Sequence, residues 1–261
     1  MNQLQLFLPC AAGVEDFLAQ EVHEITGLQG DDLRVMRGGV NLRSSWRDAM
    51  RLNLYSRLCQ RVLVQLSVTD YRNENDLYNA ASEVAWEIWF TPKQTFKIDI
   101  TAQHSPLTSL NFAALKIKDA VADRFRDKFD VRPDVDTRWP DVRIYAHLTT
   151  DTVTIYIDTS GEPLFKRGWR EDKGDATLKE TLAAAMLAAA RARTPAAAAR
   201  PDLPMRVSPA IPPREARAVF RAMMRGVAIM AAMPRTPMPR PAAFTGSGNC
   251  ARKPRTLFPI F

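Results

Sequence analysis

The densest group of residues suited to binding chemistry is the run KRGWR, where Lys166, Arg167 and Arg170 surround Gly168 and Trp169. Cations of this kind contact phosphates, and an indole ring can stack on a base, so the composition suits a nucleic-acid partner. The alternative is a solvated linker in which Trp169 is buried at a domain junction. We favour RNA-facing cations at Lys166, Arg167 and Arg170, and for Trp169 we favour packing over stacking while keeping it as a candidate.

A second group of candidates lies in the stretch NFAALKIKD, where Lys116 and Lys118 flank the apolar Ile117. On a helix the two lysines lie about 200° apart, so both cannot easily contact one phosphate. One of them is expected to face RNA while the other is solvated, and two ordinary surface lysines remain an equal alternative. Asn111, near the expected helix start, either caps the helix or contacts RNA, and capping is favoured.

The other polar residues do not form a catalytic constellation. His147 is expected on the polar face of a strand, together with Arg143 and Tyr145. For His147 we favour a surface polar role over that of a catalytic base. His23 and His104 have no ligand spacing around them, so we predict neither a metal site nor a nucleophile. Trp86 and Trp89 are expected in the core. The three scattered cysteines fit a reducing cytoplasm rather than a disulfide framework.

Charge divides the 261 residues into two parts. Residues 1–190 contain 23 Lys or Arg against 27 Asp or Glu, whereas residues 191–261 contain 13 against two, so the formal charge of +7 comes from the tail. A polyanion bound by the first part must therefore contact a local basic patch. The N-terminus lacks the basic region of a signal peptide, and no apolar run is long enough to span a bilayer.

The first 70 residues predict a β-α-β-β-α-β unit. Strands are expected at 4–8 and 61–68, a helix at 12–25 that ends at Gly27, a hairpin around RGG at 37–39, and a helix from a Ser45–Asp48 capping box to about Arg57. This order is the split-βαβ, ferredoxin-like arrangement. A unit of this size is marginal alone and should pack on its neighbour.

A second α+β unit follows in the order α-β-α-β-β. Helices are expected at 74–90 and 108–130, the latter with a buried stripe of apolar residues, and strands at 95–101, 142–148 and 153–158. The stripe consists of Leu110, Ala114, Ile117, Val121, Phe125 and Phe129. Thr177 and Glu180 then form a capping box for a helix at 178–190, with Leu178, Leu182, Ala185 and Met186 on its apolar face.

The tail from residue 191 has a different composition. It contains twelve of the 18 prolines and twelve arginines, and no apolar period persists beyond a weak helical stretch at 214–232. The pieces TGSGNC and IPPR do not provide a cofactor fingerprint, since the first follows no strand and opens no helix. We interpret residues 191–261 as coding sequence read in a shifted frame, with a genuine disordered basic arm as the alternative.

Three stretches together resemble the N-terminal part of THUMP-domain, S-adenosylmethionine-dependent RNA methyltransferases, and most of all the bacterial enzymes that methylate N2 of a guanine in 23S ribosomal RNA. They are FLPCAAGVEDFLAQEV at 7–22, NFAALKIKDAVADRFR at 111–126 and GEPLFKRGWREDKGDATLKETLAAA at 161–185. The third is the most specific, and the resemblance covers about residues 1–190. It implies a ferredoxin-like domain at 1–66, a THUMP domain at 67–158, and a bridge at 159–190 toward a methyltransferase domain.

The resemblance implies that the first two domains hold RNA, while a downstream domain binds S-adenosylmethionine and transfers the methyl group. Neither the glycine-rich turn after a strand nor the N/D-P-P-aromatic loop of such domains occurs in residues 191–261. We therefore expect an RNA-binding protein that binds no cofactor and is inactive alone. The alternatives are a stand-alone RNA-binding module with a basic tail and a transfer-RNA-modifying THUMP methyltransferase.

Overall fold

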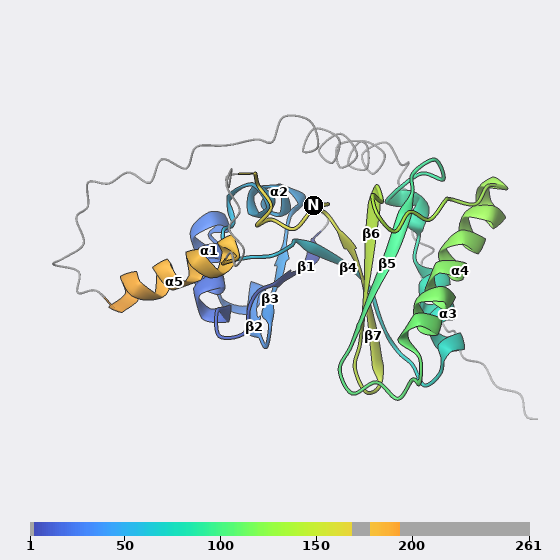
Figure 1. Cartoon of the computed structure of the whole chain (residues 1–261), viewed down its shortest axis with the longest axis horizontal. Helices are drawn as coiled ribbons and strands as arrows, with labels where there is room; N and C mark the ends of the chain where they lie inside the picture. Colours follow the sequence, from blue (N-terminus) through green and yellow to red (C-terminus); the bar gives the residue numbers. More distant parts are fainter. Residues whose placement is uncertain (1–2, 169–177, 194–261) are drawn as a thin grey trace, which may run out of the picture.

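The computed structural model describes residues 3–168 and 178–193, which form an α+β protein (Figure 1). Seven strands make one mixed sheet in the order β2-β3-β1-β4-β7-β6-β5. The strands are β1 (Leu4–Pro9), β2 (Leu33–Met36), β3 (Gly39–Ser44), β4 (Leu63–Asp70), β5 (Phe96–Ala102), β6 (Val142–Leu148) and β7 (Thr152–Asp158). The helices are α1 (Glu15–Thr26), α2 (Trp46–Tyr55), α3 (Glu74–Glu83), α4 (Leu110–Phe129) and α5 (Glu180–Arg193).

The N-terminal unit, β1 to β4, has the predicted β-α-β-β-α-β order. Its strands β2, β3, β1 and β4 are all paired antiparallel, as the ferredoxin-like arrangement requires. Both predicted helix boundaries are confirmed. Gly27 closes α1 in the left-handed conformation, which glycine adopts at no steric cost, and Ser45 and Asp48 form a complete capping box at the start of α2.

The second unit, α3 to β7, also has the predicted order, but the helix predicted at 74–90 is too long. Helix α3 ends at Glu83, Val84 is extended, and a short 3-10 helix covers Trp86–Ile88. The break lets the fully buried indole of Trp86 donate a hydrogen bond to Ala81 O at 2.8 Å. A straight helix would not bring this side chain back onto the preceding turn.

The predicted buried stripe of α4 is confirmed in the middle of the helix and wrong at its ends. Ile117, Val121 and Phe125 are buried, whereas Leu110 and Phe129 are 36% and 49% exposed. Helix α4 has 20 residues, so it is longer than the strands beneath it and its ends extend beyond them.

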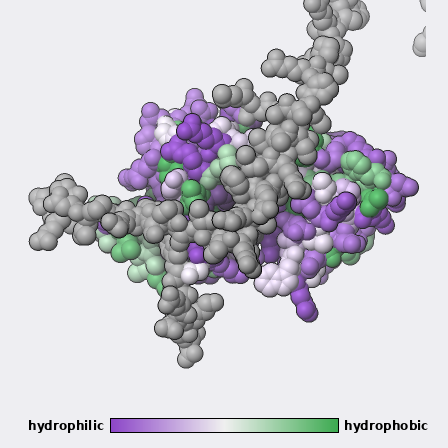
Figure 2. All heavy atoms as spheres, turned by 90° about the horizontal axis from the view of Figure 1, so that it is seen from above, coloured by the Kyte–Doolittle hydropathy of each residue, from purple (hydrophilic) through white to green (hydrophobic). Residues whose placement is uncertain are grey.

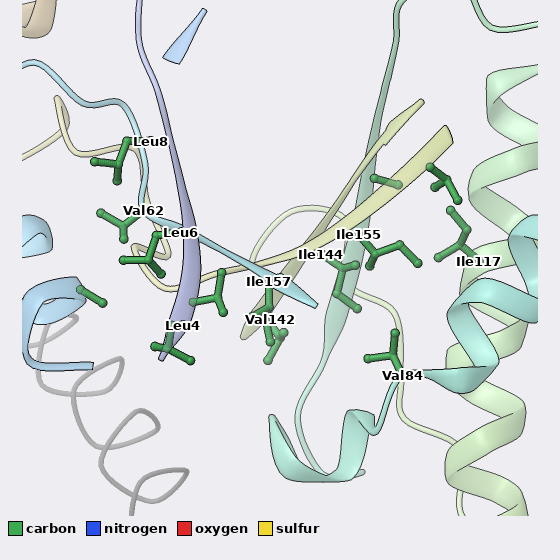
Figure 3. Close-up of a cluster of buried hydrophobic side chains, with 14 of the residues drawn as sticks. Leu4, Leu6, Leu8, Val62, Val84, Ile117, Val142, Ile144, Ile155 and Ile157 are labelled. Carbon is green, nitrogen blue, oxygen red and sulfur yellow. The ribbon is translucent and has the colours of Figure 1, made fainter. Parts of the chain in front are cut away.

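Strand β4 joins the two units into one sheet. It pairs with β1 at Leu6–Val64 and Phe7–Leu63, and with β7 along its whole length. Val64 therefore has an inward neighbour on each side, Leu6 and Ile157, and the apolar core continues from β1 through β7 to α3 and α4 (Figure 3). The smaller unit thus packs on its neighbour, as its size predicts.

Helix α5 lies against α1 and keeps much of its apolar surface exposed. Thr181 and Ala185 are buried, whereas Leu182 and Met186 are 39% and 60% exposed. The predicted capping residue Thr177 lies outside the described residues. In the view from above, the coloured atoms that are visible are mostly hydrophilic, with smaller hydrophobic groups among them (Figure 2).

A buried carboxylate fixes the turn that follows α2. Glu21 on α1 is only 4% exposed, and it accepts hydrogen bonds from Ser56 Oγ at 2.9 Å and from the backbone N–H of Leu58 at 3.1 Å. It also binds the backbone N–H and the Nε of Arg57. One side chain therefore satisfies a cluster of donors at the entry to β4.

We predict that Glu21→Ala lowers the free energy of unfolding by about 2–4 kcal/mol, because buried donors lose a charged acceptor. Urea unfolding midpoints measure the change. Glu24→Ala, on the exposed side of the same helix, is the matched control and should change stability by less than about 0.5 kcal/mol. Equal effects of the two substitutions would contradict this account of Glu21.

Candidate nucleic-acid interface

Arg167, one of the predicted RNA contacts, lies against the N-terminal unit. Its guanidinium donates to the backbone carbonyls of Leu54 at 2.6 Å, Ser56 at 2.7 Å and Asn53 at 3.1 Å, and its Nε donates to Leu164 O at 2.8 Å. Burial lowers the pKa of the guanidinium from its usual value. These carbonyls are the exposed acceptors at the C-terminal end of α2, where a cation is favourable.

The segment before Arg167 is fastened to the same region. Asn53 on α2 donates to Thr159 Oγ1 at 2.8 Å and accepts from Ser160 Oγ at 2.7 Å, while Ser160 Oγ accepts from the N–H of Val62. The backbone of Leu164 donates to Gln60 O. We call residues 159–167 the strap, because they tie the end of β7 back to α2 and to the start of β4.

A charged network lies on the β6–β7 part of the sheet, beside the strap. Arg61 pairs with Asp158 and lies 5.3 Å from the centre of the Tyr145 ring. Burial raises the pKa of Asp158 to about 6, against the opposing effect of Arg61, and raises that of Tyr145 to about 12. Arg143 reaches Glu162 at 3.2 Å, so this network also holds the strap.

Of the other three candidates of the KRGWR run, the structure describes one. Lys166 is an exposed side chain that pairs with Glu162 at 3.0 Å, and Trp169 and Arg170 lie outside the described residues. RNA contact by these residues stays a prediction. For Arg167, the structure adds a role as a clamp on α2 that the sequence does not suggest.

A different group of polar side chains gathers where α3 and α4 begin. Contacts between these helices advance in step, from Asn75–Lys116 through Tyr78–Asp123 to Ser82–Arg124, so the helices run in the same direction. Their positive dipole ends therefore lie at the same end of the second unit, which favours anions there. We call this the helix-start end; it comprises residues 72–75, 103–116 and 149–151.

The loops at the helix-start end are held by one buried tyrosine. The Tyr71 hydroxyl lies 2.6 Å from Thr149 O and 2.7 Å from Ser105 Oγ, and its backbone N–H donates to Asp151 O. Nearby His104 is exposed and has a φ of +58°, a conformation that few non-glycine residues adopt. This end is therefore an ordered surface.

A cation, an amide and an aromatic ring meet on the helix-start end. Lys116 Nζ lies 5.5 Å from the centre of the Phe112 ring and donates to Asn75 Oδ1 at 3.4 Å. The Phe112 side chain is 48% exposed, and Leu115 beside it is 50% exposed. A ring offered to solvent with a cation against it suits a stacked base and a nearby phosphate.

A helix cap at this end holds one of its acidic groups, and a neighbouring cation is exposed. The Asp76 carboxylate accepts from the N–H groups of Arg72 and Asn73, completing the box at the start of α3. The Arg72 side chain is exposed, and none of the ion pairs among the described residues includes it.

The remaining candidates on α4 have separate positions. Lys118 pairs with Asp119 at 2.8 Å, unlike Lys116. The favoured capping role of Asn111 is wrong, because Ser109 is the N-cap and its Oγ accepts from the N–H of Phe112 at 3.3 Å. Asn111 is exposed in the first turn. Sequence reasoning missed Arg72, Asn75 and Phe112, although the capping residues Asn73 and Ser109 mark both helix starts.

The other predictions concern His147, a metal site and a membrane span. His147 is half-buried, its Nδ1 lies 2.9 Å from Thr101 Oγ1, and burial lowers its pKa. Within residues 3–168 and 178–193, no cluster of His, Cys, Asp and Glu is placed to hold a metal ion. None of the helices in this part of the chain is long and apolar enough to cross a membrane.

The two structural units coincide with two known domain families. Residues 5–63 match the RlmL ferredoxin-like domain, and residues 71–158 match the THUMP domain. The chain is therefore a protein with a ferredoxin-like domain followed by a THUMP domain, as the resemblance implies.

The pair of domains relates the chain to one group of methyltransferases. It is 40% identical over 184 residues to the ribosomal RNA large subunit methyltransferase K/L of Psychromonas ingrahamii and 38% identical over 184 residues to that of Syntrophotalea carbinolica. Both matches cover 70% of this chain, but 24% and 25% of the relatives. The chain contains the N-terminal ferredoxin-like and THUMP domains of this family and spans about a quarter of its relatives' length.

Solved structures share the fold. A Listeria monocytogenes protein, described as a predicted N6-adenine-specific DNA methylase, superposes with a TM-score of 0.63 at 27% identity, over 72% of this chain and 48% of its own. SMU.472, solved in complex with SAH, superposes with a TM-score of 0.66 at 21% identity, over 87% and 65%. Both likenesses support the α+β fold described above.

We predict that Arg167→Ala lowers the free energy of unfolding by about 2–4 kcal/mol, because the carbonyls at the end of α2 lose a charged donor. Lys166→Ala, which removes an exposed pair, should cost less than about 1 kcal/mol. Urea unfolding and RNA titration of both variants separate the two roles of Arg167. Unchanged stability with weakened RNA binding would refute the clamp.

Proposed function

We propose that this chain binds RNA through its THUMP domain, at the helix-start end. The observation that carries the proposal is the meeting of Lys116, Phe112 and Asn75 where two helix dipoles begin, with Arg72 exposed just before α3. The first 190 residues carry more acidic than basic groups, so a local cluster of this kind is what a polyanion requires. The ring and the cations suit an unpaired nucleotide rather than a duplex.

The relatives supply the biological setting of the proposal. Because they are ribosomal RNA large subunit methyltransferases, we infer that the RNA is 23S ribosomal RNA and that the bound segment is presented for guanine-N2 methylation. The family uses S-adenosylmethionine, and SMU.472 was solved with SAH. We assign no cofactor-binding residue to the described part of this chain, and the chemistry would belong to a further domain.

RNA titrations at several salt concentrations test the site. Arg72→Ala/Lys116→Ala should reduce the slope of log affinity against log salt by about 1.4, because each phosphate contact on a single strand contributes about 0.7. Phe112→Ala should weaken binding by about 1–3 kcal/mol with an unchanged slope. Lys128→Ala, at the other end of α4 and paired with Glu87, is the control. If Lys128→Ala reduced the salt slope as much as Arg72→Ala/Lys116→Ala, the proposed site would be refuted.

Two further comparisons address the alternatives. If residues 191–261 are a working basic arm, their removal abolishes most of the affinity and of the salt slope, whereas our proposal predicts that the Arg72/Lys116 effect persists without them. Titration with 23S ribosomal RNA and with transfer RNA distinguishes the two possible substrates.

The chain alone is expected to transfer no methyl group, because it lacks the sequence motifs for cofactor binding and amine orientation. Incubation with labelled S-adenosylmethionine and unmodified ribosomal RNA checks this expectation. Incorporation of label above a protein-free control would refute it.

A further inference from the structure

The sheet of the ferredoxin-like domain has one open face. Side chains alternate along β1 and β3, and Leu6, Leu8, Val40 and Leu42 are almost fully buried on the face covered by α1 and α2. The antiparallel register places a polar and aromatic set on the opposite face: Arg34, Asn41, Phe7, Arg43 and Gln5. None of the helices α1 to α4 covers this side (Figure 1).

Two arginines lie close together on this open face. Arg34 on β2 is opposite Asn41, and Arg43 is the next outward residue on β3, so the two are diagonal neighbours, a relation in which Cβ atoms are typically a little less than about 7–8 Å apart. Both side chains are exposed, and neither takes part in an ion pair within the described ranges. Asp31 and Asp32 precede β2 but are not bonded to either arginine. Diagonal arginines suit successive phosphates.

An aromatic surface lies next to the arginines. The ring of Phe7 rests on β3 at Gly39, where an added Cβ would come within 2.5 Å of Leu8 O and 2.7 Å of Phe7 Cε2. Any larger residue at position 39 would clash with the backbone of Leu8 and with the Phe7 ring. Tyr156 lies on the other side of Phe7, with the two ring centres 5.8 Å apart. The glycine therefore lets an aromatic ring cover the backbone of the open face.

One polar group on this face has no partner. Asn41 lies between Arg34 and Phe7 in the register, and its Nδ2 donates to Met36 Sδ at 2.7 Å. Its Oδ1 is buried and, within the described part of the chain, accepts no hydrogen bond. A buried acceptor without a donor is unusual in a folded protein and fits a donor supplied by a ligand.

We propose that this open face is a second RNA-binding surface, which takes a single-stranded segment of the RNA bound at the helix-start end. Arg34 and Arg43 contact phosphates, the Phe7 ring stacks on a base, and Asn41 Oδ1 accepts a hydrogen bond from an N–H group on the edge of a base. A sheet face with an aromatic ring and flanking cations binds unpaired nucleotides in this way. The inference rests on the RNA binding proposed above and assigns part of it to the ferredoxin-like domain.

The test compares charge-matched variants of the full chain, titrated at several salt concentrations with a 12-nucleotide oligouridylate, a 12-base-pair RNA duplex and a 23S ribosomal RNA transcript. Arg34→Ala/Arg43→Ala should reduce the salt slope for the transcript by about 1.4. Arg126→Ala/Arg132→Ala also removes two positive charges, but these arginines pair with Asp123 on α4. This variant should leave the salt slope unchanged. Equal slopes for the two double variants would overturn the proposal.

Two additional measurements do not depend on charge. Phe7→Leu keeps an apolar side chain and should weaken binding of the oligouridylate by about 5- to 150-fold without a matching effect on the duplex. Ultraviolet cross-linking of a 4-thiouridine oligonucleotide should label a peptide that contains residues 4–9 or 39–44 of the unaltered chain. Labelling confined to other peptides would overturn the proposal even if Phe7→Leu destabilises the fold.

The outcome also separates this proposal from the first. If the helix-start end binds RNA and the open face does not, Arg72→Ala/Lys116→Ala loses affinity while Arg34→Ala/Arg43→Ala behaves like the control. If only the arginine pair on the open face matters, the helix-start proposal fails and this one stands. If neither variant differs from the control, both are wrong.

Discussion

The structure depends on β4, which is the last strand of the ferredoxin-like domain and a neighbour of the last strand of the THUMP domain. Two residue pairs connect β4 to β1, whereas its whole length pairs with β7. Sharing a strand removes the exposed edge that each domain would otherwise present, and edges of this kind invite unwanted pairing. It also gives Val64 apolar neighbours on both sides, so two small cores become one.

The strap reinforces this shared strand from outside the sheet. Only two residue pairs join β4 to β1, so backbone bonding alone holds β4, and the THUMP domain paired with it, weakly to the rest of the ferredoxin-like domain. Asn53, Thr159 and Ser160 add hydrogen bonds across the junction, and Arg167 binds the end of α2. Glu21 holds the same turn from the α1 side. The domain junction is therefore polar and directional, and such bonds fix an orientation that apolar contacts alone would leave free to slide.

Local patterns in the sequence predict nearly all the helices and strands. They fail where contacts with residues distant in the sequence determine the end of a helix or the neighbour of a strand. Apolar periodicity and capping residues act within one turn, so α1, α2 and the β2–β3 hairpin follow from them. The end of α3 at Glu83 depends on the burial of Trp86. The helical spacing of apolar residues continues past Glu83, so it does not show where the helix ends. The shared β4 strand cannot be predicted from periodicity, because alternation shows which face is buried but not which strand is the neighbour.

The same limit applies to the candidate sites. Sequence reasoning selects Lys116, yet it cannot show that Asn75 meets this lysine, since the contact joins two helices and residues 41 positions apart. It selects Arg167 for its charge, and the structure shows that charge directed at backbone carbonyls on α2. A cation in sequence is equally suited to a phosphate and to the negative end of a helix, and only its position relative to the fold distinguishes these partners.

The distribution of charge limits how this protein can hold a polyanion. Most cations of the THUMP domain are paired with carboxylates, as Arg124 and Lys128 are with Glu87, so they attract an RNA strand weakly at a distance. Binding then depends on short-range contacts at the few places in the described part of the chain where cations form no ion pair. Arg72 is at one such place and the Arg34–Arg43 pair is at another. Arg72 belongs to the same helix-start end as the exposed Phe112 ring, and the arginine pair shares a sheet face with the partly exposed Phe7 ring. Because stacking needs an unpaired base whereas phosphate contact does not, the pairing of these two features favours single-stranded RNA over a duplex.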